Sequence, residues 1–477
     1  MTSLHDLTAL EQAAAVRAGE VSPTELVEHS LRRIEALDAG LGAFLTVTPE
    51  RALAGAAAAE ERLRAGGSLP PLLGVPTAIK DLNNTAGVRT TFGSRVTADF
   101  VPTVDDAVVT KLAAAGTISL GKTNSPEFGF PFYTDNDLVG PARCPWDPSR
   151  LAGGSSGGAA VAVAAGMVPF AQGSDGGGSI RIPASINGIV GIKPTRGRVS
   201  NAPLGSEVTG LGTNGPLART VRDAAAMLDA MAGPVLGDPA WAPPLPDGET
   251  FLGWAEHSPG RLRIGRFLES PMPGIVLDPE VVTAFDDAVA LLAGLGHDIE
   301  EVPTGLLGPD VLASFERVWA LSGTTLPVPP EQVGELRPLT RELRARGLSL
   351  SARDAMESMF ALRMFSRRFL QATAQYDVLV APVCTMTPRP LGWFDADGDG
   401  AEDFERNKRY AAFTALFNVT GQPAVSLPLY WTPGGLPIGT MLVGRPADEA
   451  TLIALSAQVE EARPWADRHP DGWELTS

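Results

Sequence analysis

The sequence predicts an α/β fold in which helices cover a large, parallel or mixed β-sheet. Strand-like apolar runs alternate with helical segments along most of the 477 residues, as in layered α/β proteins. Hydrophobic residues make up 44% of the chain and charged residues 19%, which is enough to build a packed core and argues against disorder. No internal repeat of fixed period interrupts the alternation.

The first clear helix begins at a capping signal. Ser22 is a suitable N-cap, Pro23 takes the first helical position, and Glu25 can bond back to the cap. Apolar residues at helical spacing then continue to Leu37. The next predicted elements are, in order, a helix near 50–65, a buried strand over 70–79, a helix over 105–115, a strand over 117–121 and a helix over 220–232.

The C-terminal half continues the alternation after a connecting loop over 233–260, which is rich in Pro, Gly and Trp. Strands are predicted over 261–267, 298–302, 377–382, 424–429 and 436–444, and helices over 279–295 and 448–461. The segment 304–375 is mostly helical, with a proline-rich break at 327–330. Its large apolar residues suit an adaptable pocket, but at helical spacing most are expected in the core: Trp319, Met356, Met359, Phe360 and Met364.

The charge balance bears on the partners. The chain has 38 Lys and Arg against 55 Asp and Glu, a formal net charge of −17. Nucleic acids and anionic membranes select clustered positive charge, so neither is an expected partner. The N-terminus has no secretory signal and no apolar stretch is long enough to span a bilayer, so a cytoplasmic location is expected.

Metal chemistry is not expected. Two cysteines, Cys144 and Cys384, make neither a disulfide framework nor a thiolate cluster. The five histidines are dispersed without metal-ligand spacing, which disfavours a zinc hydrolase: His5, His29, His257, His297 and His469. We therefore expect neither a metal nor an organic cofactor.

Three partial motif matches are interpreted as ordinary turns. Residues 116–123 fit the phosphate-loop pattern, but a helix precedes them and strand-like residues fill them. Residues 210–215 fit the dinucleotide fingerprint without a strand before them, and we interpret them as a loop. Residues 395–400 resemble the start of a calcium loop, but the position that should hold a glutamate is Arg406.

Two segments rich in glycine and serine, 153–158 and 173–179, are the best candidates for chemistry. Dense glycines let the backbone approach a ligand and leave N–H groups free. Ser179 ends a triple-glycine run whose N–H groups could hold an oxyanion, but a nucleophilic serine needs a base. Lys80, after the apolar run 74–79, could be that base if burial lowers its pKa. Taken alone, each segment also fits a plain turn, and the lysine a surface charge.

With their neighbours, these segments resemble the amidase signature family of serine hydrolases. The matching residues lie in 74–81, 121–129, 136–147, 153–158, 173–183 and 191–200, and further similarities at 215–220, 421–424, 435–439 and 464–466 extend over nearly the whole chain. The resemblance implies one α/β/α domain over 1–477 around a large mixed, twisted sheet. Its signature core would span about 70–200, and a substrate-pocket helical region about 304–375.

The resemblance also implies a Ser–cis-Ser–Lys triad. Ser179 would be the nucleophile, Ser155 the bridging serine after a cis peptide bond, and Lys80 the base. The oxyanion hole would consist of the backbone N–H groups of Gly176, Gly177, Gly178 and Ser179. Many members of the family have threonine at the position of Gly176. With glycine there, the motif resembles the branch that contains aryl acylamidases, nylon-oligomer hydrolases and urethanases.

The expected activity is hydrolysis of the C–N bond of small-molecule amides, with anilides and carbamates as candidate substrates, through an acyl-enzyme on Ser179. The expected partner is thus a small-molecule amide or carbamate substrate, and the expected assembly is a monomer or homodimer. One alternative is the glutamine-hydrolysing component of a tRNA-dependent amidotransferase, which shares the signature. A catalytically inactive scaffold is another, against which the intact Lys80, Ser155 and Ser179 argue.

Overall fold

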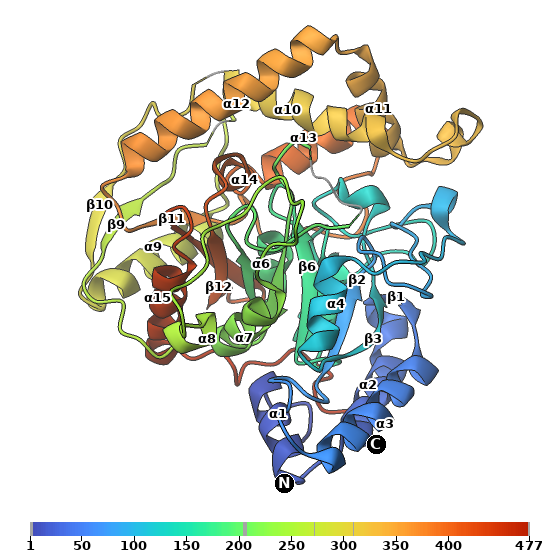
Figure 1. Ribbon diagram of the computed structural model, residues 1–477. Helices are drawn as coiled ribbons and strands as arrows, with labels where there is room; N and C mark the ends of the chain where they lie inside the picture. Colours follow the sequence, from blue (N-terminus) through green and yellow to red (C-terminus); the bar gives the residue numbers. More distant parts are fainter. Residues whose placement is uncertain (1–2, 204–207, 271, 309, 476–477) are drawn as a thin grey trace.

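A mixed sheet of eight strands runs through the centre of the computed structural model, which describes residues 3–203, 208–270, 272–308 and 310–475 (Figure 1). Its strands are β6 (Phe170–Asp175), β7 (Val190–Lys193), β8 (Thr213–Ala218), β9 (Arg263–Arg266), β10 (Asp298–Glu301), β11 (Val378–Pro382), β12 (Ala424–Trp431) and β13 (Pro437–Gly444). Their order is β10-β9-β11-β13-β12-β7-β8-β6, with β9 parallel to β10 and β11 and the other neighbours antiparallel. The predicted α/β fold with a mixed sheet is confirmed.

A second sheet of three strands lies beside the edge strand β6. Its order is β1-β3-β2, with bounds β1 (Phe44–Val47), β2 (Pro76–Lys80) and β3 (Ile118–Thr123). The hydroxyl of Thr77 donates to the carbonyl of Phe170 (3.2 Å), and the N–H of Lys80 donates to the side chain of Gln172 (2.9 Å). These bonds fix β2 against β6, so Lys80 lies next to the chain that leads to Ser179. A separate hairpin pairs β4 (Arg143–Cys144) with β5 (Asp147–Leu151).

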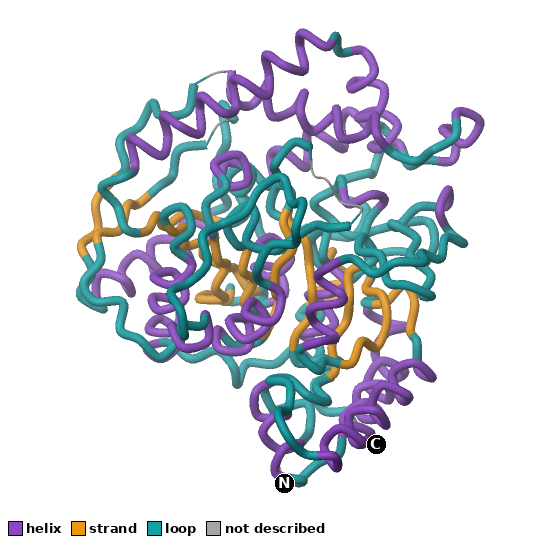
Figure 2. The backbone as a smooth tube through the Cα atoms, in the orientation of Figure 1, coloured by secondary structure: helices purple, strands orange, loops and turns teal. Residues whose placement is uncertain are grey.

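Helices enclose the strands on both sides (Figure 2). Their bounds are α1 (Ala9–Ala18), α2 (Pro23–Leu41), α3 (Pro49–Ala65), α4 (Ala107–Ala114), α5 (Gly157–Ala164), α6 (Arg181–Asn187), α7 (Val221–Met231), α8 (Phe251–Trp254), α9 (Pro279–Gly294), α10 (Asp310–Ser322), α11 (Pro338–Ser349), α12 (Ala352–Thr373), α13 (Gly400–Tyr410), α14 (Leu416–Thr420) and α15 (Glu449–Ala462). Within the described residues, no helix is both long and apolar enough to cross a membrane.

Two hydrophobic cores occupy the two faces of the large sheet. One core packs α7, α9 and α15 against strand residues such as Val425 and Leu442. The other packs α6 and the helices α10 to α13 against their neighbours on the opposite face, Ala424 and Val443. Adjacent residues of a strand point to opposite faces, so a strand such as β12 contributes Val425 to one core and Ala424 to the other.

Most predicted elements are confirmed, with three corrections. The strand predicted over 70–79 begins only at Pro76, because residues 71–74 form a turn. The predicted loop over 233–260 contains the short α8. Residues 213–215, interpreted as part of a loop, open β8, so the glycines of 210–215 lie before and at the start of a strand, whereas a dinucleotide site needs them between a strand and the following helix.

The other two rejected motifs behave as interpreted. Residues 116–123 form the turn from α4 into β3 and the strand itself, which is the predicted helix–turn–strand connection. In the acidic turn 395–400, the guanidinium of Arg406 forms an ion pair with Asp397 (2.5 Å). The carboxylate is therefore neutralised by a side chain of the protein.

The prediction that most of the five large residues of 304–375 lie in the core was wrong, because two are exposed on α12 and Met359 and Met364 are only partly buried. Met356 and Phe360 are 67% and 65% exposed, because the opposite face of this helix, with Leu362, Phe365 and Phe369, packs inward. Trp319 is buried, as predicted for most of the set.

Candidate active site

Lys80 is the last residue of β2, and its side chain is fully buried. Its Nζ lies 2.8 Å from Oγ of Ser155 and donates to the carbonyl (3.3 Å) and hydroxyl (3.0 Å) oxygens of Ser174. Burial lowers the pKa of Lys80 from 10.5 to about 7, and the Asp175 carboxylate opposes this shift only in part. A neutral amine has two N–H groups for Ser174 and a lone pair for Ser155, so the contacts suit a base.

Ser155 and Ser156 lie in the glycine-rich segment between β5 and α5 and have different partners. The peptide bond between Gly154 and Ser155 is cis, as the resemblance implied. The hydroxyl of Ser156 donates to the carbonyl of Ser174 (3.1 Å) and accepts from its N–H (3.2 Å). Ser156 is therefore fixed to β6, whereas the Ser155 hydroxyl contacts Lys80.

Ser179 lies in the turn between β6 and α6 and is 2% exposed. Its carbonyl accepts the N–H of Ser156 at 3.1 Å, which holds the two glycine-rich segments together. Among the described residues, no hydrogen bond joins the hydroxyls of Ser155 and Ser179. Hydrogen bonds between catalytic groups often form only when substrate binds, and a rotation of the Ser179 side chain is the movement that a proton relay would need here.

Asp175 fixes the turn that carries Ser179, and the sequence analysis missed it. Its carboxylate accepts the N–H of Gly178 (2.7 Å) and the side-chain amide of Asn418 (2.9 Å), and it forms a buried ion pair with Arg181 (2.9 Å). Burial alone would raise the pKa of Asp175, but Arg181 outweighs burial and holds that pKa well below its usual range. The available signal was an acid and a base that flank a glycine run.

The four N–H groups predicted for the oxyanion hole differ in availability. The N–H of Gly178 is bound to the carboxylate of Asp175, so it stabilises the turn and is not free for a ligand. The N–H groups of Gly176, Gly177 and Ser179 have no hydrogen-bond partner among the residues described. These three amides remain for a developing negative charge.

Two other buried lysines show that burial alone does not identify the base. Burial lowers the pKa of Lys122 to about 8, and burial together with nearby cationic charge lowers that of Lys193 to about 7. The Nζ of Lys122 donates to the hydroxyl of Thr90 (2.9 Å), and that of Lys193 to a backbone carbonyl (3.0 Å). The contact with Ser155 is what distinguishes Lys80.

Aromatic rings cover the glycine turn. A Cβ atom on Gly176 would lie 3.3 Å from the indole of Trp319, and one on Gly177 would lie 3.0 Å from the ring of Phe132. The ring of Phe315 stacks on Trp319 with centroids 5.6 Å apart. The helix α10 thus brings Trp319 and Phe315 to the turn, which sequence spacing could not reveal.

Potential metal ligands lie away from the serines. In the described part of the chain, one group has ligand spacing: His5, Asp6 and Glu474, whose ligand atoms lie within 4.8 Å of one another where the two ends of the chain meet. It belongs to neither glycine-rich segment. Cys144 and Cys384 are buried free thiols, and burial raises the pKa of each to about 12.

Comparisons with known proteins point in one direction. A family model described as Amidase matches residues 25–453. An acylamidase of Rhodococcus erythropolis is 36% identical, covering 98% of each chain, and a 6-aminohexanoate-cyclic-dimer hydrolase of Paenarthrobacter ureafaciens is 35% identical, covering 97% of this chain and 96% of that one. A solved structure of 6-aminohexanoate cyclic dimer hydrolase with its substrate superposes with a TM-score of 0.90 at 32% identity, covering 99% of this chain and 100% of that chain.

Proposed function

The chain belongs to the amidase signature family, whose members hydrolyse amide C–N bonds, and we propose that it acts on small-molecule amides through an acyl-enzyme on Ser179. The observation that carries this proposal is the 2.8 Å contact between Nζ of Lys80 and Oγ of Ser155 in a buried site beside Ser179. A buried amine of lowered pKa next to a hydroxyl is an arrangement suited to general-base catalysis.

The proposed acylation step moves one proton along the triad. Neutral Lys80 accepts the proton of Ser155 while Ser155 accepts that of Ser179, whose Oγ attacks the substrate carbonyl carbon. The N–H groups of Gly176 and Gly177, with that of Ser179, stabilise the negative oxygen. As the C–N bond breaks, Ser155 gives a proton to the leaving amine and regains one from Lys80. Water then hydrolyses the ester by the same relay in reverse.

The proposed substrates have an apolar group next to the scissile bond. Trp319, Phe132 and Phe315 surround Gly176 and Gly177, and aromatic walls favour apolar or aromatic substituents. Anilides and carbamates carry such groups beside a carbonyl, and the similarity to an acylamidase supports them as first candidates. The proposed working form is the chain alone, as a monomer or homodimer.

A substrate panel tests this proposal. The purified chain is expected to hydrolyse an anilide or an aryl carbamate faster than glutamine, without any other protein. Release of the aniline and of ammonia, followed side by side, gives the comparison. If glutamine were the preferred substrate and turnover required added partner proteins, the amidotransferase alternative would replace the proposal.

Removal of metal ions is expected to leave the rate unchanged. Every proposed proton transfer uses a side chain or backbone group of this chain, and the His5, Asp6 and Glu474 group lies at the chain ends. The measurement is the initial rate after prolonged dialysis against EDTA, with zinc and calcium add-back as controls. A large loss that only one of these ions restores would contradict a metal-free mechanism.

The variant Gly176→Thr is expected to lower kcat/KM by about tenfold, because overpacking beside a buried ring costs about 1–3 kcal/mol. Its Cβ would lie 3.3 Å from Trp319, closer than ordinary contact. Trp319→Leu should relieve this contact, so the double variant is expected to be more active than the product of the two single effects. Strict additivity in this double-mutant cycle would show that Trp319 does not limit the size of residue 176.

A further inference from the structure

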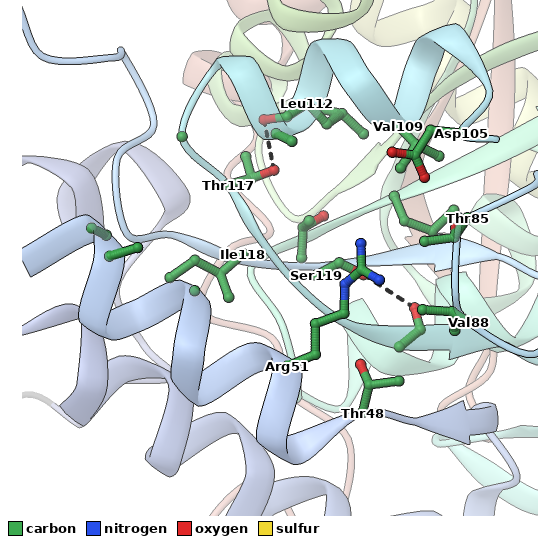
Figure 3. A pocket seen from close by; sticks show the side chains of 18 of the residues that line it. Thr48, Arg51, Thr85, Val88, Asp105, Val109, Leu112, Thr117, Ile118 and Ser119 are labelled. Atoms are coloured by element: carbon green, nitrogen blue, oxygen red, sulfur yellow. Dashed lines mark hydrogen bonds between the residues drawn. The ribbon is translucent and has the colours of Figure 1, made fainter. Parts of the chain in front are cut away.

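A cavity of about 370 Å³ lies between α3, α4 and the strands β2 and β3, away from the serines (Figure 3). Its volume is within the range of sites that hold small molecules. Ile79 lines it, whereas the next residue, Lys80, contacts Ser155. Because adjacent side chains of a strand point to opposite faces, this cavity and the catalytic groups lie on opposite sides of β2.

The interior of the cavity is mostly apolar. Its walls come from Leu73 in the turn before β2, from Ile118 of β3, from Val109 and Leu112 of α4, and from Val88. Such walls suit a hydrocarbon or aromatic body. They do not suit a strongly hydrated ligand such as a sugar or a free inorganic ion.

The charged residues at the mouth set the polarity of the ligand. Arg51 and Arg62 come from α3, and neither makes an ion pair with a described residue. Figure 3 shows the side chain of Arg51 extending into the cavity, where one of its N–H groups donates to the carbonyl of Ala86 (2.7 Å) and the others remain for a ligand. The one carboxylate of the lining, Asp105, accepts the N–H of Ala86 (2.7 Å). Lys122 also lines the cavity, but it forms a buried ion pair with Asp81 (3.7 Å) and adds no net charge. Arg51 and Arg62 against Asp105 therefore leave a surplus of one positive charge, in a chain that is strongly acidic overall.

One buried polar atom inside the cavity lacks a partner. Thr85 is 3% exposed, and its hydroxyl makes no hydrogen bond within the described residues. The neighbouring hydroxyls of Thr77 and Thr117 donate to backbone carbonyls, at 3.2 and 2.9 Å. A buried hydroxyl left without a partner costs about 1–3 kcal/mol, which a ligand oxygen would recover.

We propose that this cavity is a second ligand site that takes a small organic monocarboxylate with an apolar body. The apolar part would fill the space between β3 and α4, the carboxylate would pair with Arg51 and Arg62, and Thr85 would donate to an oxygen of the ligand. A single carboxylate matches the single surplus charge, and the planar guanidinium of Arg51 matches the geometry of a carboxylate. This site is separate from the proposed amidase site and does not depend on it.

Isothermal titration calorimetry with 4-phenylbutyrate tests the site, with neutral 4-phenylbutanol as the matched compound. We expect one molecule of 4-phenylbutyrate per chain and an affinity for the alcohol lower by about tenfold, the usual effect of losing one charge-assisted hydrogen bond. Arg51→Gln should lower the affinity for 4-phenylbutyrate by about tenfold for the same reason. Ala58→Phe, which fills the cavity from an exposed position of α3, should abolish binding.

Arg64→Gln is the control, because it removes the same charge from the same helix outside the cavity lining, and it should leave the affinity within about twofold. All three positions are exposed, so unchanged melting temperatures would show that the variants fold. The proposal is overturned by three results: no binding at millimolar 4-phenylbutyrate, equal binding of the alcohol, or an affinity that neither Arg51→Gln nor Ala58→Phe changes.

Discussion

Replacing Ser179 with alanine is expected to reduce kcat for amide hydrolysis by about 10⁴-fold or more, the loss seen when a serine hydrolase loses its nucleophile. The hydroxyl makes no hydrogen bond within the described residues, and the turn is held by the ion pair of Asp175 with Arg181. The melting temperature should therefore stay close to that of the parent. A fluorophosphonate probe should label the parent at Ser179, as read by peptide mass spectrometry, and should not label the variant.

Ser185→Ala is the matched control for this experiment. Ser185 lies on α6, the helix that follows Ser179, and its hydroxyl accepts the N–H of Gly439 at 2.8 Å. Loss of this hydroxyl should lower the free energy of unfolding by about 1 kcal/mol and change the rate of hydrolysis little. If the probe labelled Ser156 instead, or if Ser179→Ala remained active, the nucleophile would be misassigned.

The parts of the fold that the sequence predicted are those with a periodic apolar signal. Strands β11 and β13 are nearly continuous apolar runs, and α2 has a complete capping box at Ser22 and Glu25. The structure around the serines has no such signal. All eight residues of α5 are buried, so its sequence shows no helical periodicity, and β6 ends in polar and glycine residues.

The site could be predicted only in part, and for a physical reason. Lys80, Ser155 and Ser179 stand at positions that a motif can mark, because Lys80 ends a strand, Ser155 lies between two glycine pairs and Ser179 ends a glycine run. Asp175 and Trp319 act through contacts that tertiary packing creates: one between an acid and distant amides, the other between α10 and a glycine turn. The acid and base that flank the glycine run hint at Asp175, but no local pattern gives its contact with Asn418 or that of Trp319 with the turn.

The lowered pKa of Lys80 changes how a pH profile must be interpreted. An unperturbed lysine would titrate far above neutrality, and a rise near pH 7 would ordinarily indicate a histidine. With the pKa of Lys80 at about 7, a lysine base and a histidine base predict nearly the same dependence of rate on pH. His5, near the N-terminus, stacks on His29 of α2, and burial lowers the pKa of both to about 4. The pH profile therefore identifies the base only when it is combined with substitutions.

Lys80→Met is expected to lower kcat/KM by about 10³-fold or more and to abolish its pH dependence near neutrality, since methionine keeps the length and apolarity but has no lone pair to accept a proton. In the parent, the base is active when neutral, so the rate should rise with pH through about 7 and stay high above it. At pH 6 it should be about a tenth of its value at pH 8. The measurement is kcat/KM against pH for both proteins.

Stability gives an independent check on the same ionisation. Because the folded-state pKa of Lys80 is lowered, the unfolded chain binds the extra proton between about pH 7 and 10.5, and the contribution of this group to stability rises with pH over that window. Lys80→Met removes that rise, so its free energy of unfolding should depend less on pH there than that of the parent. Substantial activity in Lys80→Met, or its loss on replacing a histidine, would show that Lys80 is not the base, whereas an unchanged stability profile would show that the lysine is charged in the folded protein at neutral pH.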